Sequence, residues 1–119
     1  GSARHEGAYV DVVRRAREHV SARQDDPPSI GDLCMALGVS RRWLQLSFNA
    51  VLQTSPLAYL RAMRLGGARR MLASGTAGIQ VKDAVEAFGF WHLSRFSHDY
   101  RRLFGELPSE TLRRTHERA

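Results

Sequence analysis

Residues 89–109 read GFWHLSRFSHDYRRLFGELPS, a stretch that combines two side-chain patterns on one expected helix. Large apolar side chains recur at the spacing of a buried helix face: Phe96, Tyr100, Leu103 and Phe104. Polar and basic side chains lie between them: Ser94, Ser97, His98 and Arg101. Gly105 then ends the helix, and Pro108 starts another. The stretch predicts a helix that packs on one side and contacts a polar partner on the other.

The same pattern occurs earlier in the chain, so the sequence contains an internal repeat. The apolar, proline and arginine positions of this copy match positions 52 residues before them: Leu44, Phe48, Leu52, Pro56, Leu60 and Arg61. The short helix ahead of each copy repeats with a spacing of 51 residues, as in Asp32 and Asp83. Each copy reads as a short helix, a turn with glycine, a second helix and a proline-started helix, which describes a helix-turn-helix unit. An ordinary helical bundle with matching loops is the alternative.

The rest of the chain fits an all-α fold with about seven helices. Apolar residues at helical spacing begin near Tyr9, and the run of residues 25–28, DDPP, stops that first helix. Pro56 starts a long helix that reaches about Ala73. No stretch alternates with period 2, so no strand is expected. We expect a tag remnant and flexible start, a first helix-turn-helix subdomain, a linker helix and a second helix-turn-helix subdomain: residues 1–7, 8–55, 56–74 and 75–119.

The second helix of each unit carries the candidate site residues. In the first copy, polar or exposed positions follow i, i+3, i+4 and i+7 spacing, opposite the apolar stripe: Arg42, Gln45, Leu46 and Asn49. In the second copy, the equivalent positions are occupied by Ser94, Ser97, His98 and Arg101. Most of these side chains can hydrogen-bond base edges or phosphates, so we interpret both faces as facing DNA. Residues that flank them are candidate phosphate contacts: Ser40, Arg41, Arg101 and Arg102. The alternative for either helix alone is a solvated face.

The charge, apolar content and cysteine count of the chain limit the kinds of partner and compartment that are expected. The net charge of +6 favours an acidic polymer or an anionic surface as partner, and the 43% apolar content suffices for a packed core. No apolar run approaches the roughly 20 residues that a membrane span needs. Cys34 is the one cysteine, which excludes an internal disulfide and a thiolate zinc cluster and favours a reducing, cytoplasmic setting. We expect Cys34 to be a small buried side chain.

Catalysis, metal and cofactor binding are not expected. Ser94, His98 and Asp99 lie close in sequence, but no nucleophile elbow or oxyanion-hole motif accompanies them. His92 and His98 are six positions apart, on nearly opposite helix faces, so they lack metal-ligand spacing. The glycine turn at residues 75–78 lacks the Gly-Lys-Ser/Thr ending of a phosphate loop.

The chain resembles the AraC/XylS family of bacterial transcription regulators over about residues 8–115. Residues 89–109 match the family pattern G-F-x5-F-S-x2-F/Y-x3-F-G-x2-P-S. Further matches are VSRRxLQ at residues 39–45, SPxxYL at residues 55–60 and RLxxAxxxL at residues 64–72. The segments at residues 81–84 and 89–93 also resemble the ethanolamine-operon regulators within that family.

The resemblance implies seven helices in two helix-turn-helix subdomains joined by the long helix from Pro56. It also implies that the two reading helices enter successive major grooves, about 34 Å apart, on one face of double-stranded DNA. The base-reading positions carried over from the family are Arg42, Gln45, Leu46, Leu93, Ser94, Ser97 and His98. RNA polymerase is a further expected partner. Family members usually carry a separate effector-binding or dimerisation domain, and the start Gly1-Ser2, read as a cloning remnant, suggests that this domain was removed.

The sequence departs from the family pattern at three places. Leu46 stands where many members carry Arg, which replaces a guanine contact by an apolar contact with a thymine methyl group. His92 stands where Asp is a common N-cap, which weakens that cap. The pair Gly66-Gly67 is expected to soften the linker helix.

Sequence-specific DNA binding in the cytoplasm of a bacterium, at the nucleoid when bound, is the leading hypothesis. An architectural, non-specific DNA binder and a helical protein-interaction module are the alternatives. Trp43 is expected to serve core or helix packing rather than a base contact. Trp91 is expected to anchor a turn against its own subdomain, with its indole N–H within reach of a phosphate as the alternative.

Overall fold

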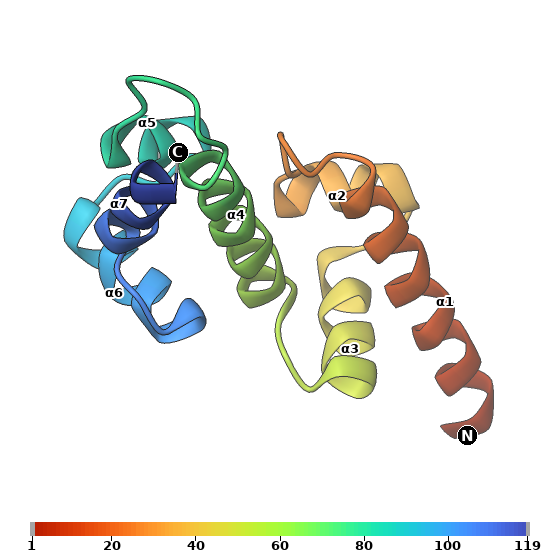
Figure 1. Ribbon diagram of the computed structural model, residues 1–119. Helices are drawn as coiled ribbons and strands as arrows, with labels where there is room; N and C mark the ends of the chain where they lie inside the picture. The colour runs from red at the N-terminus through yellow and green to blue at the C-terminus, as the bar shows by residue number, and fades with distance from the viewer. Residues whose placement is uncertain (1, 119) are drawn as a thin grey trace. The chain divides into compact units, whose positions relative to one another are not determined.

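The computed structural model describes the backbone of residues 2–118, and this part of the chain forms seven α-helices and no strand (Figure 1). The helices are α1 Ser2–Ser21, α2 Ile30–Leu37, α3 Arg41–Leu52, α4 Pro56–Leu72, α5 Val81–Ala87, α6 Leu93–Phe104 and α7 Pro108–Arg118. The all-α class and the number of helices expected from the sequence are confirmed.

The chain divides into two compact units, an N-terminal unit that ends at Met63 and a C-terminal unit that begins at Arg64. Each unit has its own apolar core. The first core consists of Val12, Val13, Ala16, Val20, Leu33, Leu37, Leu44, Phe48 and Leu60. The second consists of Leu65, Ala68, Leu72, Ala84, Val85, Phe88, Phe96 and Tyr100. The division falls inside the predicted linker helix, whose first half serves one core and whose second half serves the other.

Helix caps repeat between the two units at the spacings found in the sequence. Asp32 Oδ2 accepts a hydrogen bond from the backbone N–H of Ser29 at the start of α2, and Asp83 Oδ2 accepts one from Gln80 at the start of α5. The residues that cap the ends of α3 and α6, Gln53 and Gly105, both adopt left-handed backbone conformations, with φ of 53° and 76°. The repeat is therefore a repeat of local backbone structure and not of residue types alone.

Helix α1 begins at Ser2, within the segment 1–7 that is expected to be a tag remnant and flexible start, and Gly1 lies outside the described residues. Its first turns carry an aromatic cluster against α3. The rings of Tyr9 and Trp43 lie 4.9 Å apart, and the His5 ring lies 6.0 Å from both. These contacts confirm that Trp43 serves helix packing.

The two glycines of α4 have different surroundings. A Cβ atom on Gly67 would lie 2.2 Å from Cε1 of the buried Phe88 ring, so only glycine admits this ring. A Cβ atom on Gly66 would meet only Arg70 Nη1 at 3.6 Å, which is an ordinary contact. Because α4 runs through both positions, the pair does not interrupt the helix, and the structural reason for Gly67 is the close approach of Phe88.

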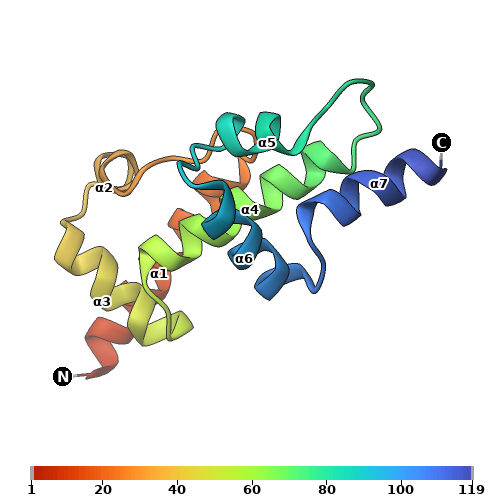
Figure 2. The same cartoon turned by 90° about the vertical axis from the view of Figure 1, so that its left-hand side faces the viewer.

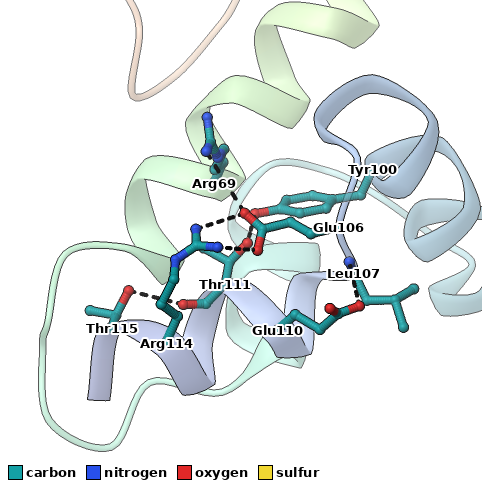
Figure 3. A network of polar contacts seen from close by, with 8 residues as sticks. All are labelled: Arg69, Tyr100, Glu106, Leu107, Glu110, Thr111, Arg114 and Thr115. Carbon is teal, nitrogen blue, oxygen red and sulfur yellow. Dashed lines mark hydrogen bonds and ion pairs between the residues drawn. The ribbon is translucent and has the colours of Figure 1, made fainter. Parts of the chain in front are cut away.

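A polar network joins the end of α6 to α7 and to the second half of α4 (Figure 3). Glu106 accepts two hydrogen bonds of 2.7 Å from Arg114, and Arg69 Nη2 lies 3.8 Å from its carboxylate. The buried hydroxyl groups of Tyr100 and Thr111 are 2.7 Å apart and hydrogen-bonded. The Arg69 guanidinium also lies 4.9 Å from the centre of the Phe104 ring. The network ties α7 to α6, to the loop that follows α6 and to the second half of α4.

We expect Glu106→Gln to make the C-terminal unit less stable near neutral pH. The hydrogen bonds from Arg114 hold the pKa of Glu106 below its ordinary value. The stability that the ionised carboxylate contributes is therefore present above the ordinary glutamate pKa and is lost as the pH falls through the lowered one. The difference in melting temperature between wild type and variant should shrink on acidification. Glu117→Gln, an exposed change on α7, is the control and should show no such pH dependence.

Candidate functional site

Helix α3 buries one side and exposes the other. Ser40 caps it, with its Oγ accepting a hydrogen bond from the backbone N–H of Trp43 at 3.0 Å. The buried side consists of Leu44, Ser47 and Phe48. The exposed side carries all four predicted base-reading residues of this unit and one predicted phosphate contact: Arg42, Gln45, Leu46, Asn49 and Arg41. The structure therefore brings these residues together on the solvent side of a helix whose opposite side is held by the core.

Helix α6 follows α5 through the turn at residues 88–92 (Figure 2). Like α3, it buries one side and exposes the other. Its buried side consists of Phe96 and Tyr100. These rings continue an aromatic row, with centroid distances of 4.8 Å from Phe90 to Phe96, 5.7 Å from Phe96 to Tyr100 and 4.7 Å from Tyr100 to Phe104. The predicted residues Leu93, Ser94, His98, Arg101 and Arg102 are exposed, and Ser97 is half-buried. Packing of the row holds the polar side of α6 toward solvent.

The two exposed faces carry arginines that form no ion pair with a carboxylate among the described residues. In the part of the chain that the structure describes, the recorded ion pairs involve other arginines: Arg14, Arg15, Arg69 and Arg114. None of these pairs includes Arg41, Arg42, Arg101 or Arg102. Because their guanidinium groups are exposed and unneutralised, they are suited to bind the phosphates of a nucleic acid or to donate to base edges.

The first turn of α6 lacks a side-chain cap. His92 occupies the N-cap position and makes no capping hydrogen bond, whereas Ser40 at the equivalent position of α3 does. The weak cap expected from the replacement of Asp by His is confirmed.

Three expectations about apolar residues need correction or refinement. Trp91 does not anchor the turn before α6, because its side chain is 91% exposed and Phe90 packs on Phe96 instead. Leu103, expected on the buried face, is 50% exposed, because Phe104 occupies the contact with Tyr100 in the last turn. Cys34 is half-buried against the first core. An apolar residue directly before an N-cap often packs against the first turns of its helix, so the sequence carried no signal of the exposure of Trp91.

Two other kinds of site are not seen in the described residues. No group of three or more His, Cys, Asp or Glu side chains there is placed to hold a metal ion. None of the described helices combines the length and the apolar character needed to cross a bilayer.

A family model described as a helix-turn-helix domain matches residues 33–114. Among curated proteins, the chain is 34% identical over 107 residues to the probable thc operon regulatory protein of Rhodococcus erythropolis, covering 89% of this chain and 32% of that protein. It is 39% identical over 75 residues to XylDLEGF operon transcriptional activator 2 of Pseudomonas putida, covering 62% of this chain and 48% of the activator. The chain thus spans between a third and a half of the length of these relatives.

Two solved structures share the fold. One is a probable AraC family transcriptional regulator from Rhodopseudomonas palustris, with a TM-score of 0.78 at 35% identity, covering 88% of this chain and 97% of that one. The other is a transcriptional regulator with an AraC-type DNA-binding domain from Chromobacterium violaceum, with a TM-score of 0.75 at 27% identity, covering 95% and 99%. Both similarities extend over nearly the whole described chain.

Proposed function

Since the chain belongs to the helix-turn-helix family of DNA-binding domains found in AraC-type transcription regulators, we propose that it reads a specific double-stranded sequence with α3 and α6. The two helices would enter successive major grooves, as the family resemblance implies. Family and fold are those of DNA-binding domains and not of enzymes.

The observation that supports this proposal is the repeated surface of α3 and α6. In both units the second helix of the helix-turn-helix is held by buried apolar residues, and its exposed side carries hydrogen-bonding and basic side chains. An α-helix fits the major groove, where base pairs present distinct patterns of donors and acceptors. A solvated face would explain one such helix, but it does not explain the same surface in both copies of a repeat.

Residue chemistry suggests a role for each side chain. Arg42 suits a bidentate contact to guanine and Gln45 a bidentate contact to adenine, whereas Leu46 suits a thymine methyl group. Asn49, Leu93, Ser94, Ser97 and His98 are the remaining proposed base-reading positions. Phosphates would be bound by Ser40, Arg41, Arg101 and Arg102, which release counterions on binding. The Ser40 hydroxyl can donate to a phosphate while its oxygen keeps the cap of α3.

Properties of the whole protein are proposals that depend on this binding. Regulation of transcription would take place in the bacterial cytoplasm, at the nucleoid, with RNA polymerase as a further partner. An effector-binding or dimerisation domain would complete the regulator, since the relatives are much longer than this chain. The finer resemblance to the ethanolamine-operon regulators stays a prediction supported by the segments at residues 81–84 and 89–93.

Selection of binding sites from random duplexes tests the proposal. The selected sequences should converge on two short motifs about one helical turn apart, and fluorescence anisotropy should show that random DNA competes poorly with them. An architectural binder would bind duplexes without convergence. A protein-interaction module would bind none of them, and either result would refute sequence-specific reading.

We expect Gln45→Ala to relax specificity at one or two base pairs of the selected site. Loss of a bidentate contact should reduce affinity for the preferred base by about 1–3 kcal/mol and change affinity for other bases little. Arg102→Ala is the matched control, because loss of a phosphate contact should weaken all duplexes alike. The measurement is anisotropy against the selected duplex and its single-base variants.

A further inference from the structure

Trp91 is the most exposed large apolar side chain in the described part of the chain, at 91%. It lies two residues before Leu93, the first residue of α6, which is itself 54% exposed. Both residues line a hollow of about 400 Å³ against α5, together with Phe90, Lys82 and Glu86. An exposed tryptophan beside an exposed leucine keeps a large apolar area in water, which is a feature of surfaces that bind a partner.

The internal repeat shows that this exposure is not required by the fold. Ser40 and His92 are the N-cap residues of α3 and α6, so Val39 is the counterpart of Trp91. Val39 is half-buried and packs against the first core. Trp91 does not belong to the second core or to the half-buried residues around it, where Phe90 packs instead. The C-terminal unit therefore presents a large aromatic side chain where the N-terminal unit packs a small aliphatic one.

The neighbours of Trp91 favour duplex DNA as the occupant and indicate which part of it. Trp91 directly precedes the N-cap of α6 and Leu93 is the first residue of that helix, so both exposed side chains lie next in sequence to the proposed reading positions. The hollow is lined by one cation and one carboxylate, Lys82 and Glu86, so their opposite charges offer a phosphate little net attraction there. An apolar group at a base edge fits this environment, and the apolar group that the major groove offers is the thymine 5-methyl.

We propose that Trp91, with Leu93, reads a thymine by packing against its 5-methyl group at the edge of the site of α6. The inference rests on the proposed function, because it requires that α6 lies in a major groove. It adds to the polar reading positions an apolar one that precedes the helix. The second unit would thus read sequence partly through the shape of a methyl group rather than through hydrogen bonds.

The contact is tested by combining substitutions of Trp91 with removal of single thymine methyl groups from the DNA and measuring the affinity of each combination. In the selected duplex, each thymine is replaced in turn by deoxyuridine, which keeps the base pair and lacks only the 5-methyl group. At one position we expect the wild-type domain to lose about fourfold in affinity, which corresponds to the burial of one methyl group. Trp91→Ala should lose about tenfold on the thymine duplex and should no longer distinguish thymine from uracil at that position. Trp91→Phe should retain part of the discrimination.

The outcomes separate this inference from the proposed function. Because Trp91 is almost fully exposed, Trp91→Ala should leave the melting temperature unchanged, which shows that the fold is intact. If the wild type binds the selected duplex and neither Trp91→Ala nor any uracil replacement has these effects, the thymine contact is refuted while α6 can still be the reading helix. If no duplex sequence is preferred at all, the proposed function fails first.

Discussion

The affinity of this domain for its selected duplex should fall about 10³–10⁵-fold between about 50 and 200 mM salt if it contacts about 6–10 phosphates. The physical reason is counterion release, since each phosphate neutralised by Lys or Arg frees condensed cations into solution. The chain carries 18 Lys and Arg residues against 12 Asp and Glu residues. The exposed arginines beside both proposed reading faces take part in none of the ion pairs recorded among the described residues. The measurement is fluorescence anisotropy across a salt series, plotted as log affinity against log salt.

Single arginine variants make the salt experiment specific. Each of the variants Arg41→Ala, Arg101→Ala and Arg102→Ala should lower the steepness of the plot of log affinity against log salt by about one unit of slope, because each removes one phosphate contact. Arg113→Ala, an exposed arginine on α7 outside the proposed surface, is the matched control and should leave the slope unchanged. A salt series that is nearly flat for the wild type would contradict DNA binding through these faces and would favour a protein partner.

Gly67→Ala should have the largest effect on stability among the single-residue changes considered, a loss of about 1–3 kcal/mol. The added methyl group would lie 2.2 Å from Cε1 of Phe88, whose ring is buried and cannot move aside without opening the second core. The gain in helix propensity from glycine to alanine offsets only part of this strain. The measurement is chemical denaturation followed by circular dichroism.

Gly66→Ala is the matched control on the preceding residue of the same helix. Because its new Cβ would meet only Arg70 Nη1 at 3.6 Å, we expect it to stabilise the protein by about 0.5–1 kcal/mol. A loss of stability in Gly67→Ala together with a gain in Gly66→Ala would show that close packing, and not helix propensity, decides the effect at Gly67. Equal effects of the two substitutions would show that Phe88 does not occupy the position seen in the structure.

Much of the fold could be predicted because its signals are local. Ser29, Asp32 and Gly38 mark the start and end of α2 through hydrogen bonds and a backbone conformation that involve only neighbouring residues. The same holds for the helical spacing of Phe96 and Tyr100, which reflects the geometry of a single helix. The exposed faces of α3 and α6 followed from the same spacing.

Other features depend on contacts between distant residues and could not be predicted from spacing. Two adjacent aromatic residues, Phe90 and Trp91, precede α6 in the sequence. Only tertiary packing decides that Phe90 packs against Phe96 in the core and that Trp91 is exposed. Gly67 looks like a weak point in a helix until Phe88, 21 positions later, is placed against it. The contact of Tyr9 on α1 with Trp43 on α3 likewise joins residues that are far apart in the sequence. Which bases the exposed side chains contact stays a prediction.

The division of α4 between two cores has a consequence for anyone who wishes to dissect this repeat. A fragment cut after residue 55 would lack Leu60, which is fully buried in the first core. One that starts at residue 75 would lack Leu65, Ala68 and Leu72 of the second. A helix-turn-helix unit expressed separately therefore has to include the part of α4 that completes its core. For the N-terminal unit this part contains Leu60, and for the C-terminal unit it contains Leu65, Ala68 and Leu72.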